Sequence, residues 1–166
     1  SETQPLRTLS LVELAGRVRR VATRLREMGV QPGDRVVAYL PNVPECAIAM
    51  LAATSIGAVW SSAAIDFGVR TVEALQIAHA LPSLEALVWL SSDADALPDG
   101  AASLPCATHP WHALLDGPDV PPDAFRFERV GPDHPLWIVF SSGTTGLPKA
   151  IVHSHVGILV EHLKLM

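Results

Sequence analysis

Helix-patterned segments alternate with short apolar runs over residues 11–90, and this alternation constrains the fold more than any other feature of the chain. Strands that are separated by helices form βαβ units, and such units assemble into parallel sheets with helices packed on their faces. We therefore expect an α/β fold with a layered, mostly parallel sheet and flanking helices. In chain order the expected elements are a helix over 11–25, a strand over 35–40, a helix over 44–57, a strand over 58–61, a helix over 69–80 and strands over 85–90 and 135–140.

The ends of these helices carry recognisable signals. Ser10 precedes the first periodic apolar residue and Glu13 follows three residues later, which is the spacing of a capping box. Gly29 is placed to end the same helix, and Pro44 suits the first turn of the next one. Asp66 is a candidate cap for the third helix.

Composition limits the class of protein. With 166 residues, of which 49% are hydrophobic and 17% charged, the chain can form one domain with a hydrophobic core. The net charge of −5 gives no reason to expect nucleic acid as a partner. Five arginines lie between residues 17 and 26 and alternate with apolar residues at helical spacing, so we expect a solvated helix face there rather than a basic binding patch.

Neither secretion nor a membrane is expected. The first ten residues are polar and lack the apolar region of a signal peptide. Residues 46–65 carry no charge and are long enough to cross a bilayer, but they are mostly alanine with serine and threonine interspersed. A buried helix, broken near Gly57 and followed by a strand, is the better interpretation. Cys46 and Cys106 form no CxxC pair, and reduced cysteines of this kind are typical of a cytoplasmic protein.

Residues 91–135 differ from the rest of the chain. Proline and aspartate are dense, and helical periodicity is lost apart from a short WHALL run. We expect a long surface connection here. It would join an α/β region over 8–90 to a strand, loop, strand and helix over 136–166, all within a partial domain over 1–166.

The nonapeptide SSGTTGLPK at 141–149 is suited to bind an anion. Gly143 and Gly146 allow the backbone to aim successive N–H groups into one concavity, while the neighbouring hydroxyls and Lys149 add donors and a positive charge. The kinase P-loop does not fit, because Lys149 follows Gly146 by three residues and precedes an alanine. An extended run and a helix from about Ser154 should follow, which places the loop between two strands. On spacing alone, a hairpin loop that binds nothing remains the alternative.

Longer runs around the nonapeptide resemble a known family. The run WIVFSSGTTGLPKAIVHSH closely resembles the phosphate-loop signature of the adenylate-forming enzymes, the acyl-CoA synthetase superfamily. Within it, HPLWIVFSSGTTGLPKAIVHSHVGILVEHLK is similar to the acetoacetyl-CoA synthetases in particular. Residues 8–70, including DFGVR at 66–70, are similar to the upstream part of those enzymes. The resemblance implies part of their large N-terminal domain.

The same resemblance implies a two-step acid–CoA ligase that uses ATP, Mg²⁺ and coenzyme A. Acetoacetate would attack the α-phosphate of ATP to give an acyl-adenylate and diphosphate, and the thiol of coenzyme A would then displace AMP. Lys149 and Thr145 would be catalytic, with Thr144 and Thr145 as the main hydroxyl contacts to the β- and γ-phosphates. The residues that would bind the nucleotide are Ser141, Ser142, Gly143, Thr144, Thr145, Gly146, Lys149 and His155.

Two further histidines, His153 and His162, lie close to His155 in the sequence. His153 and His155 are two apart, so in a strand they would share a face, and His155 stands where the superfamily often has a histidine. Lining of the active site by this pair is an expectation. Zinc binding is not expected, because no third ligand has suitable spacing. His162 is expected to be packed or on the surface, so no metal-binding residue is assigned.

The chain also departs from the family pattern. Counterparts of the adenine-binding segment, the magnesium-binding glutamate, the ribose-binding aspartate and the C-terminal domain with the adenylation lysine are missing before Met166. The chain is therefore expected to be a fragment that is inactive without the remainder of its parent protein, and residues 69–83 look contracted. Two alternatives stay open: a ligase for acetate, propionate or another short acid, and a non-catalytic nucleotide-binding paralogue.

Overall fold

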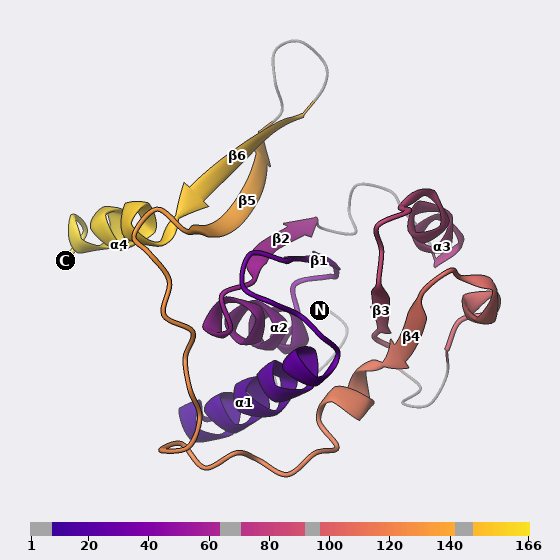
Figure 1. Ribbon diagram of the computed structural model, residues 1–166, viewed down its shortest axis with the longest axis horizontal. Coiled ribbons are helices and arrows are strands. Elements are labelled where there is room, and N and C mark those ends of the chain that lie inside the picture. The colour runs from indigo at the N-terminus through magenta and orange to yellow at the C-terminus, as the bar shows by residue number, and fades with distance from the viewer. Residues whose placement is uncertain (1–7, 64–70, 92–96, 142–147) are drawn as a thin grey trace.

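Helices and strands alternate along the first half of the chain, as the apolar pattern predicts (Figure 1). The computed structural model describes residues 8–63, 71–91, 97–141 and 148–166. In chain order the elements are α1 (Leu11–Glu27), β1 (Arg35–Tyr39), α2 (Pro44–Ser55), β2 (Val59–Ala63), α3 (Thr71–Ala80), β3 (Ala86–Trp89), the 3₁₀ turn η2 (Ala101–Ser103), β4 (Ala107–Pro110), the 3₁₀ turn η3 (Trp111–Leu114), β5 (Pro135–Ser141), β6 (Lys149–Ser154) and α4 (His155–Leu163).

The main sheet has four strands in the order β1-β2-β5-β6. β1, β2 and β5 run parallel, and β6 returns antiparallel to β5. In Figure 1, α1 and α2 lie together below β1 and β2, and the β5–β6 hairpin extends away from the opposite side. A mostly parallel sheet with flanking helices confirms the expected α/β class.

One expected strand lies outside this sheet. β3 pairs in parallel with β4, in register from Ala86 opposite Ala107 to Trp89 opposite Pro110, as a separate two-stranded sheet. The strand expected over 85–90 is therefore present, and it pairs with β4 rather than with the strands of the main sheet. Pairing across the chain, which local apolar pattern does not encode, decides which strands become neighbours.

The segment between β3 and β5 contains more structure than a surface connection. It supplies β4 and η3, and it sends Leu114 and Phe125 into the main core, where they are 2% and 7% exposed. The expectation of a surface connection is thus wrong for Leu114 and Phe125, which lie in the core. The isolated apolar residues among the prolines and aspartates gave no periodic signal, yet Leu114 and Phe125 pack into the core.

Three of the signals at the helix ends are confirmed, whereas the Glu13 half of the expected capping box, which lies within the described residues, is not formed. The Ser10 hydroxyl accepts a hydrogen bond from the backbone N–H of Glu13, at 3.1 Å, and so caps α1. The Glu13 carboxylate pairs with Arg17 one turn along the helix. Gly29 follows the C-cap residue Met28 with φ at 95°, a conformation that favours glycine, and Pro44 begins α2. Asp66, the candidate cap of α3, lies outside the described residues.

The core lies where α1 and α2 meet the sheet. Val21 of α1 and Ile48 of α2 are 1% and 0% exposed, and Trp60 of β2 packs in the same cluster at 4%. Trp137 of β5 packs against this cluster while remaining half-buried. Alanines on α2 allow the two helices to approach closely. Burial of this apolar surface is the main stabilising contribution to the fold, and it holds β2 firmly at the centre of the sheet.

The arginine side of α1 is a packing surface rather than a solvated face. Arg19 Nε donates hydrogen bonds to Asp119 Oδ1 at 2.9 Å and to the carbonyl of Val120 at 2.8 Å, and its side chain is 14% exposed. Arg26 donates to the carbonyl of Arg126 and lies over the ring of Phe125, 5.4 Å from its centroid. The expectation of a solvated face is therefore wrong for Arg19 and Arg26, which fasten the segment that precedes β5 onto α1. Arg17 and Arg24 are more exposed and pair with acids within the helix.

β1 is less buried than its sequence suggests. Among its residues Ala38 is buried, whereas Val37 is 70% exposed, because β1 is the end strand of the described sheet. The buried strand expected over 35–40 is thus an edge strand here. Within the described residues no helix has both the length and the apolar character needed to cross a membrane, and residues 46–63 form α2, a turn and β2.

Candidate functional site

The hairpin formed by β5 and β6 carries the candidate site. β5 joins the sheet beside β2, with Trp60 opposite Trp137 and Ser61 opposite Ile138, and the Ser61 hydroxyl donates to the Ile138 carbonyl at 2.9 Å. Since β1, β2 and β5 are parallel, their carboxyl ends point the same way, and Ser141 ends β5 at that edge. Ligands of open α/β sheets bind outside the carboxyl ends of the strands.

Ser141 and Lys149 face each other at the loop end of the hairpin. They form the outermost pair of an antiparallel ladder that continues inward through Phe140 opposite Ala150. Directly opposed residues of an antiparallel pair have Cβ atoms about 4.5–5.5 Å apart and lie on the same face. The hairpin thus brings the first and the last residue of the nonapeptide together, and it confirms that the nonapeptide connects two strands.

The other predicted binding residues fall between these two. Ser142, Gly143, Thr144, Thr145 and Gly146 lie outside the described residues, so their contacts stay predictions. Of the two residues that frame them, Ser141 is half-buried and Lys149 is exposed. An exposed ammonium on a flexible stem can reach a ligand held by the loop, which is the arrangement that a phosphate-facing cation needs.

His155 lies at the opposite end of the hairpin. β6 runs from Lys149 to Ser154, which at about 3.4 Å per residue spans about 17 Å, and His155 follows as the first residue of α4. The structure therefore does not bring His155 next to Ser141 and Lys149, and its role in nucleotide binding stays a prediction. The shared strand face expected for His153 and His155 is wrong, because the second of them is helical.

His155 has a partner that the sequence did not reveal. Its ring lies against that of His134, with centroids 5.8 Å apart, and its Nε2 atom is buried without a hydrogen-bond partner among the described residues. Burial lowers the pKa of His155 below its ordinary value, and neighbouring His134 lowers it further. His134 itself contacts the carbonyl of Gly57 at 2.8 Å through Nε2. A lone histidine immediately before the expected strand carried no signal of this contact.

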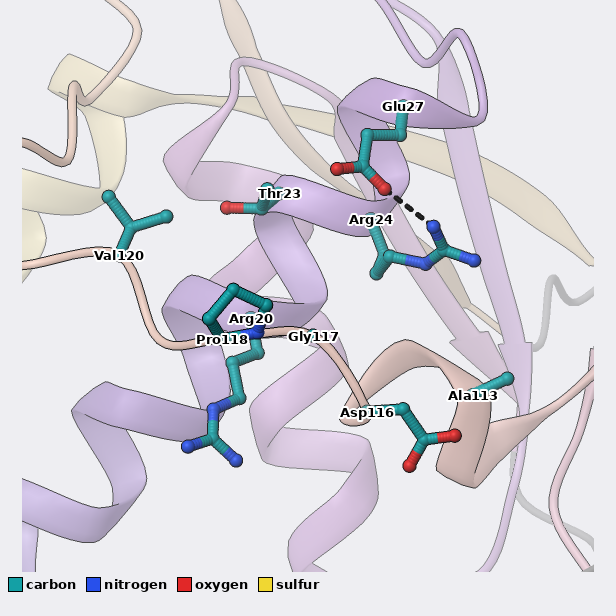
Figure 2. A pocket seen from close by; sticks show the side chains of 9 residues that line it. All are labelled: Arg20, Thr23, Arg24, Glu27, Ala113, Asp116, Gly117, Pro118 and Val120. Carbon is teal, nitrogen blue, oxygen red and sulfur yellow. Dashed lines mark hydrogen bonds and ion pairs between the residues drawn. The ribbon is translucent and has the colours of Figure 1, made fainter.

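A hollow lies on α1, away from the hairpin. It has a volume of about 450 Å³, and Arg20, Arg24, Glu27 and Asp116 line it together with Pro118 and small neighbours. Figure 2 shows that the guanidinium groups of Arg20 and Arg24 end on different sides of the hollow, and Arg24 pairs with Glu27 at 2.6 Å. Two acids balance two bases here, so the hollow lacks the convergent positive charge of a phosphate site.

The fold and the site define a class of protein. A mostly parallel α/β sheet that carries a hairpin rich in glycine, serine and threonine at its carboxyl edge belongs to the N-terminal domain of an adenylate-forming enzyme. The family model described as AMP-binding enzyme matches residues 3–166, and the chain belongs to that family.

Relatives of the chain narrow the comparison. An acetoacetyl-CoA synthetase from Macaca fascicularis is 37% identical over 181 residues, covering 92% of this chain and 27% of the relative. The solved acetoacetyl-CoA synthetase from Streptomyces lividans is 38% identical, with a TM-score of 0.83 over 98% of this chain and 28% of that one. ATP-bound MatB from Rhodopseudomonas palustris is 25% identical, with a TM-score of 0.70 over 95% of this chain and 32% of that one.

The chain therefore spans about a quarter to a third of the length of these relatives. The alignment with the macaque protein extends over 181 residues although it uses 92% of a 166-residue chain, so the relative has residues in this region that the chain lacks. That difference is in keeping with a contraction. Its place at 69–83 stays a prediction.

Proposed function

We propose that this chain is the phosphate-binding part of an acid–CoA ligase, and that the protein carrying it forms acetoacetyl-CoA, AMP and diphosphate from acetoacetate, ATP and coenzyme A. The observation that carries the proposal is the hairpin at the carboxyl edge of the sheet, where Ser141 opposes Lys149 across the nonapeptide loop. The similarity to acetoacetyl-CoA synthetases supports the acid, and the likeness to ATP-bound MatB supports the nucleotide.

In the proposed first step a carboxylate oxygen of the acid bonds to the α-phosphorus of ATP, and the bond from that phosphorus to the β-phosphate oxygen breaks. Negative charge accumulates on the departing diphosphate, so fixed donors around it lower the barrier. Ser141 and the loop would supply hydroxyl and N–H donors, and Lys149 would supply the opposing charge. In the second step the sulfur of coenzyme A bonds to the acyl carbon, AMP leaves and the thiol proton is released.

The donors of the hairpin suit phosphate rather than metal. Hydroxyl, N–H and ammonium groups bind phosphate oxygens, whereas Mg²⁺ prefers carboxylate and other oxygen ligands in octahedral geometry. In the described part of the chain no group of three or more His, Cys, Asp or Glu side chains could hold a metal ion. We therefore propose that Mg²⁺ is held by the phosphates of ATP and by residues outside this chain.

The hairpin and α4 expose apolar surface that a complete enzyme would cover. All nine residues of α4 are described, and none of its side chains is buried; Leu159 and Leu163 are 58% and 60% exposed. On β6, Val152 is 57% exposed. Exposed apolar surface of this kind marks an interaction face. We propose that the remainder of the parent protein packs there and supplies the adenine, acyl and coenzyme A sites, so the chain alone does not turn over.

Exchange of labelled diphosphate into ATP tests the proposal, because it reports the first step alone. The protein that carries this chain should exchange label when acetoacetate is present, and faster than with acetate or propionate. Faster exchange with either of those acids would move the proposal to another short-chain ligase. This chain alone should bind MgATP in calorimetry without exchanging label. If ATP binds but no acid supports exchange, the ligase function is overturned and the non-catalytic nucleotide-binding alternative stands. If neither protein binds ATP, both are overturned.

A further inference from the structure

We propose that His134 is a positioning residue that fixes the base of the phosphate hairpin to the body of the domain. This inference rests on the proposed function for its effect on ATP, but its structural part stands on contacts alone. The juxtaposition is between the residue that precedes β5, the turn that precedes β2 and the start of α4, three segments that are distant in sequence.

The first contact ties His134 to the turn before β2. Its Nε2 atom lies 2.8 Å from the carbonyl oxygen of Gly57, which also accepts a hydrogen bond from the backbone N–H of Gly33 at 2.8 Å. A carbonyl oxygen has two lone pairs and donates nothing, so Nε2 of His134 must carry the proton. The imidazole and the Gly33 amide together satisfy both lone pairs of this buried glycine carbonyl.

The second contact ties the same residue to the far strand of the hairpin. The carbonyl of His134 accepts from the backbone N–H of His155 at 3.1 Å, and the carbonyl of Pro132 accepts from Val156 at 3.2 Å. The Ser154 hydroxyl accepts from Gly157, also at 3.2 Å. The first three N–H groups of α4, which have no partner inside a helix, are thus all bonded. His134 therefore contacts both strands at the base of the hairpin: it immediately precedes β5, and its carbonyl binds the residue that follows β6.

The position of the base matters because the hairpin overhangs the sheet. The register between β2 and β5 consists of Trp60 opposite Trp137 and Ser61 opposite Ile138, near the base. Ser141 lies three residues further, about 10 Å at 3.4 Å per residue. Beyond Ile138 the described part of β5 is paired with β6 alone. A small rotation at the base is therefore magnified at the Ser141–Lys149 pair, where phosphate would bind.

The adjacent rings of His134 and His155, tilted by 47°, complete the arrangement. The ring centroids of His134 and His155 lie 5.8 Å apart, so a second proton on both rings would place two positive charges side by side next to the positive end of α4. The geometry requires a proton on Nε2 of His134 and gives a proton on His155 no acceptor at Nε2 among the described residues. This pairing is a structural feature of the base of the hairpin, distinct from any contact to nucleotide.

Two substitutions separate positioning from mere stability. His134→Gln keeps an N–H donor that can reach the Gly57 carbonyl, whereas His134→Leu keeps bulk and removes the donor. The matched control is His162→Leu, which removes an exposed histidine of α4. In this chain we expect His134→Leu to speed amide hydrogen exchange at Val139, Phe140 and Ile151. We also expect it to weaken MgATP binding about tenfold, which corresponds to the loss of one hydrogen bond to a buried group. His134→Gln should restore both, and the control should change neither.

Long-range ¹H–¹⁵N spectra of the wild-type imidazoles supply a readout that needs no nucleotide. They should show His134 protonated at Nε2; an Nδ1–H tautomer overturns the proposal. It is also overturned if His134→Leu lowers the melting temperature while hairpin exchange and ATP affinity stay as in the wild type. If the wild-type chain binds no ATP, the proposed function fails in this chain, and the exchange and tautomer results alone decide the positioning role.

Discussion

Ser141 and Lys149 are directly opposed at the loop end of an antiparallel hairpin, so the first and last residues of the nonapeptide lie at the same edge of the sheet. This pairing makes Lys149 the residue with the sharpest expected effect on nucleotide binding. Lys149→Ala should weaken MgATP binding by this chain about tenfold, because it removes a charge from a phosphate site. Isothermal calorimetry measures the change.

The control for this prediction is Lys164→Ala. Lys164 is an exposed lysine whose amine pairs with Glu161 at 2.6 Å, on the surface beyond the hairpin. Lys164→Ala should leave ATP affinity unchanged. Neither Lys149→Ala nor Lys164→Ala should alter the melting temperature by much, because both side chains are exposed. Equal loss of affinity in the two variants would mean that only net charge matters, which would contradict a specific role for Lys149.

Arg19 should matter to stability more than its neighbour Arg17. Arg19 is 14% exposed and hydrogen-bonded to both Asp119 and the Val120 carbonyl, whereas Arg17 is 36% exposed and pairs with Glu13 within α1. Arg19→Ala leaves the Asp119 carboxylate without its cation, and we expect a clearly lower urea midpoint than for Arg17→Ala. Equal midpoints would show that the segment before β5 does not depend on this contact.

Gly57 should tolerate alanine poorly. Its φ is 78°, and an added Cβ would lie 3.0 Å from Cγ of Glu128 and 3.1 Å from Cβ of Pro32. Gly33 has φ at 91° with open space around it, so Gly33→Ala reports the backbone cost alone. We expect about 1 kcal/mol of destabilisation for Gly33→Ala and about 2–4 kcal/mol for Gly57→Ala, measured by urea denaturation. Similar values for the two would show that the neighbours of Gly57 give way.

Acid should destabilise the chain through His155. The pKa of this residue is lowered from its ordinary 6.5, first by burial and then by His134. As the pH falls below 6.5 the unfolded chain takes up a proton there before the folded chain does, so the unfolded state is favoured until the lower folded pKa is passed. The stability lost in this window should be smaller in His155→Gln than in the wild type. Urea midpoints between about pH 7 and pH 5 measure the difference, with His162→Gln as the control that should follow the wild type.

Local signals in the sequence were sufficient for some elements. Ser10 and Gly29 marked the two ends of α1, because caps and left-handed glycines act within a few residues. The nonapeptide was correctly placed between two strands, since a glycine-rich run between apolar runs is itself a turn signal. The resemblance to adenylate-forming enzymes rested on the same contiguous residues, which is why it was confirmed by the family comparison.

Contacts between distant residues could not be predicted in this way. Arg19 and Asp119 are 100 positions apart, and nothing beside either residue indicates the other. The contact of His134 with Gly57 depends on the path of the chain around the sheet, as does the pairing of β3 with β4. Composition made residues 91–135 look like solvent-exposed connection, although Leu114 and Phe125 are buried, because two apolar residues in a proline-rich run produce no period.

The parallel pairing of β2 with β5 has a consequence for the order in which the chain is made. Ser61 and its partner Ile138 are 77 positions apart, so a ribosome must add all the intervening residues before β2 acquires its second neighbour. Until then one edge of β2 has no strand paired to it on the nascent chain. We expect this interval to be the period in which newly synthesised chains are most prone to associate with one another and most dependent on chaperones.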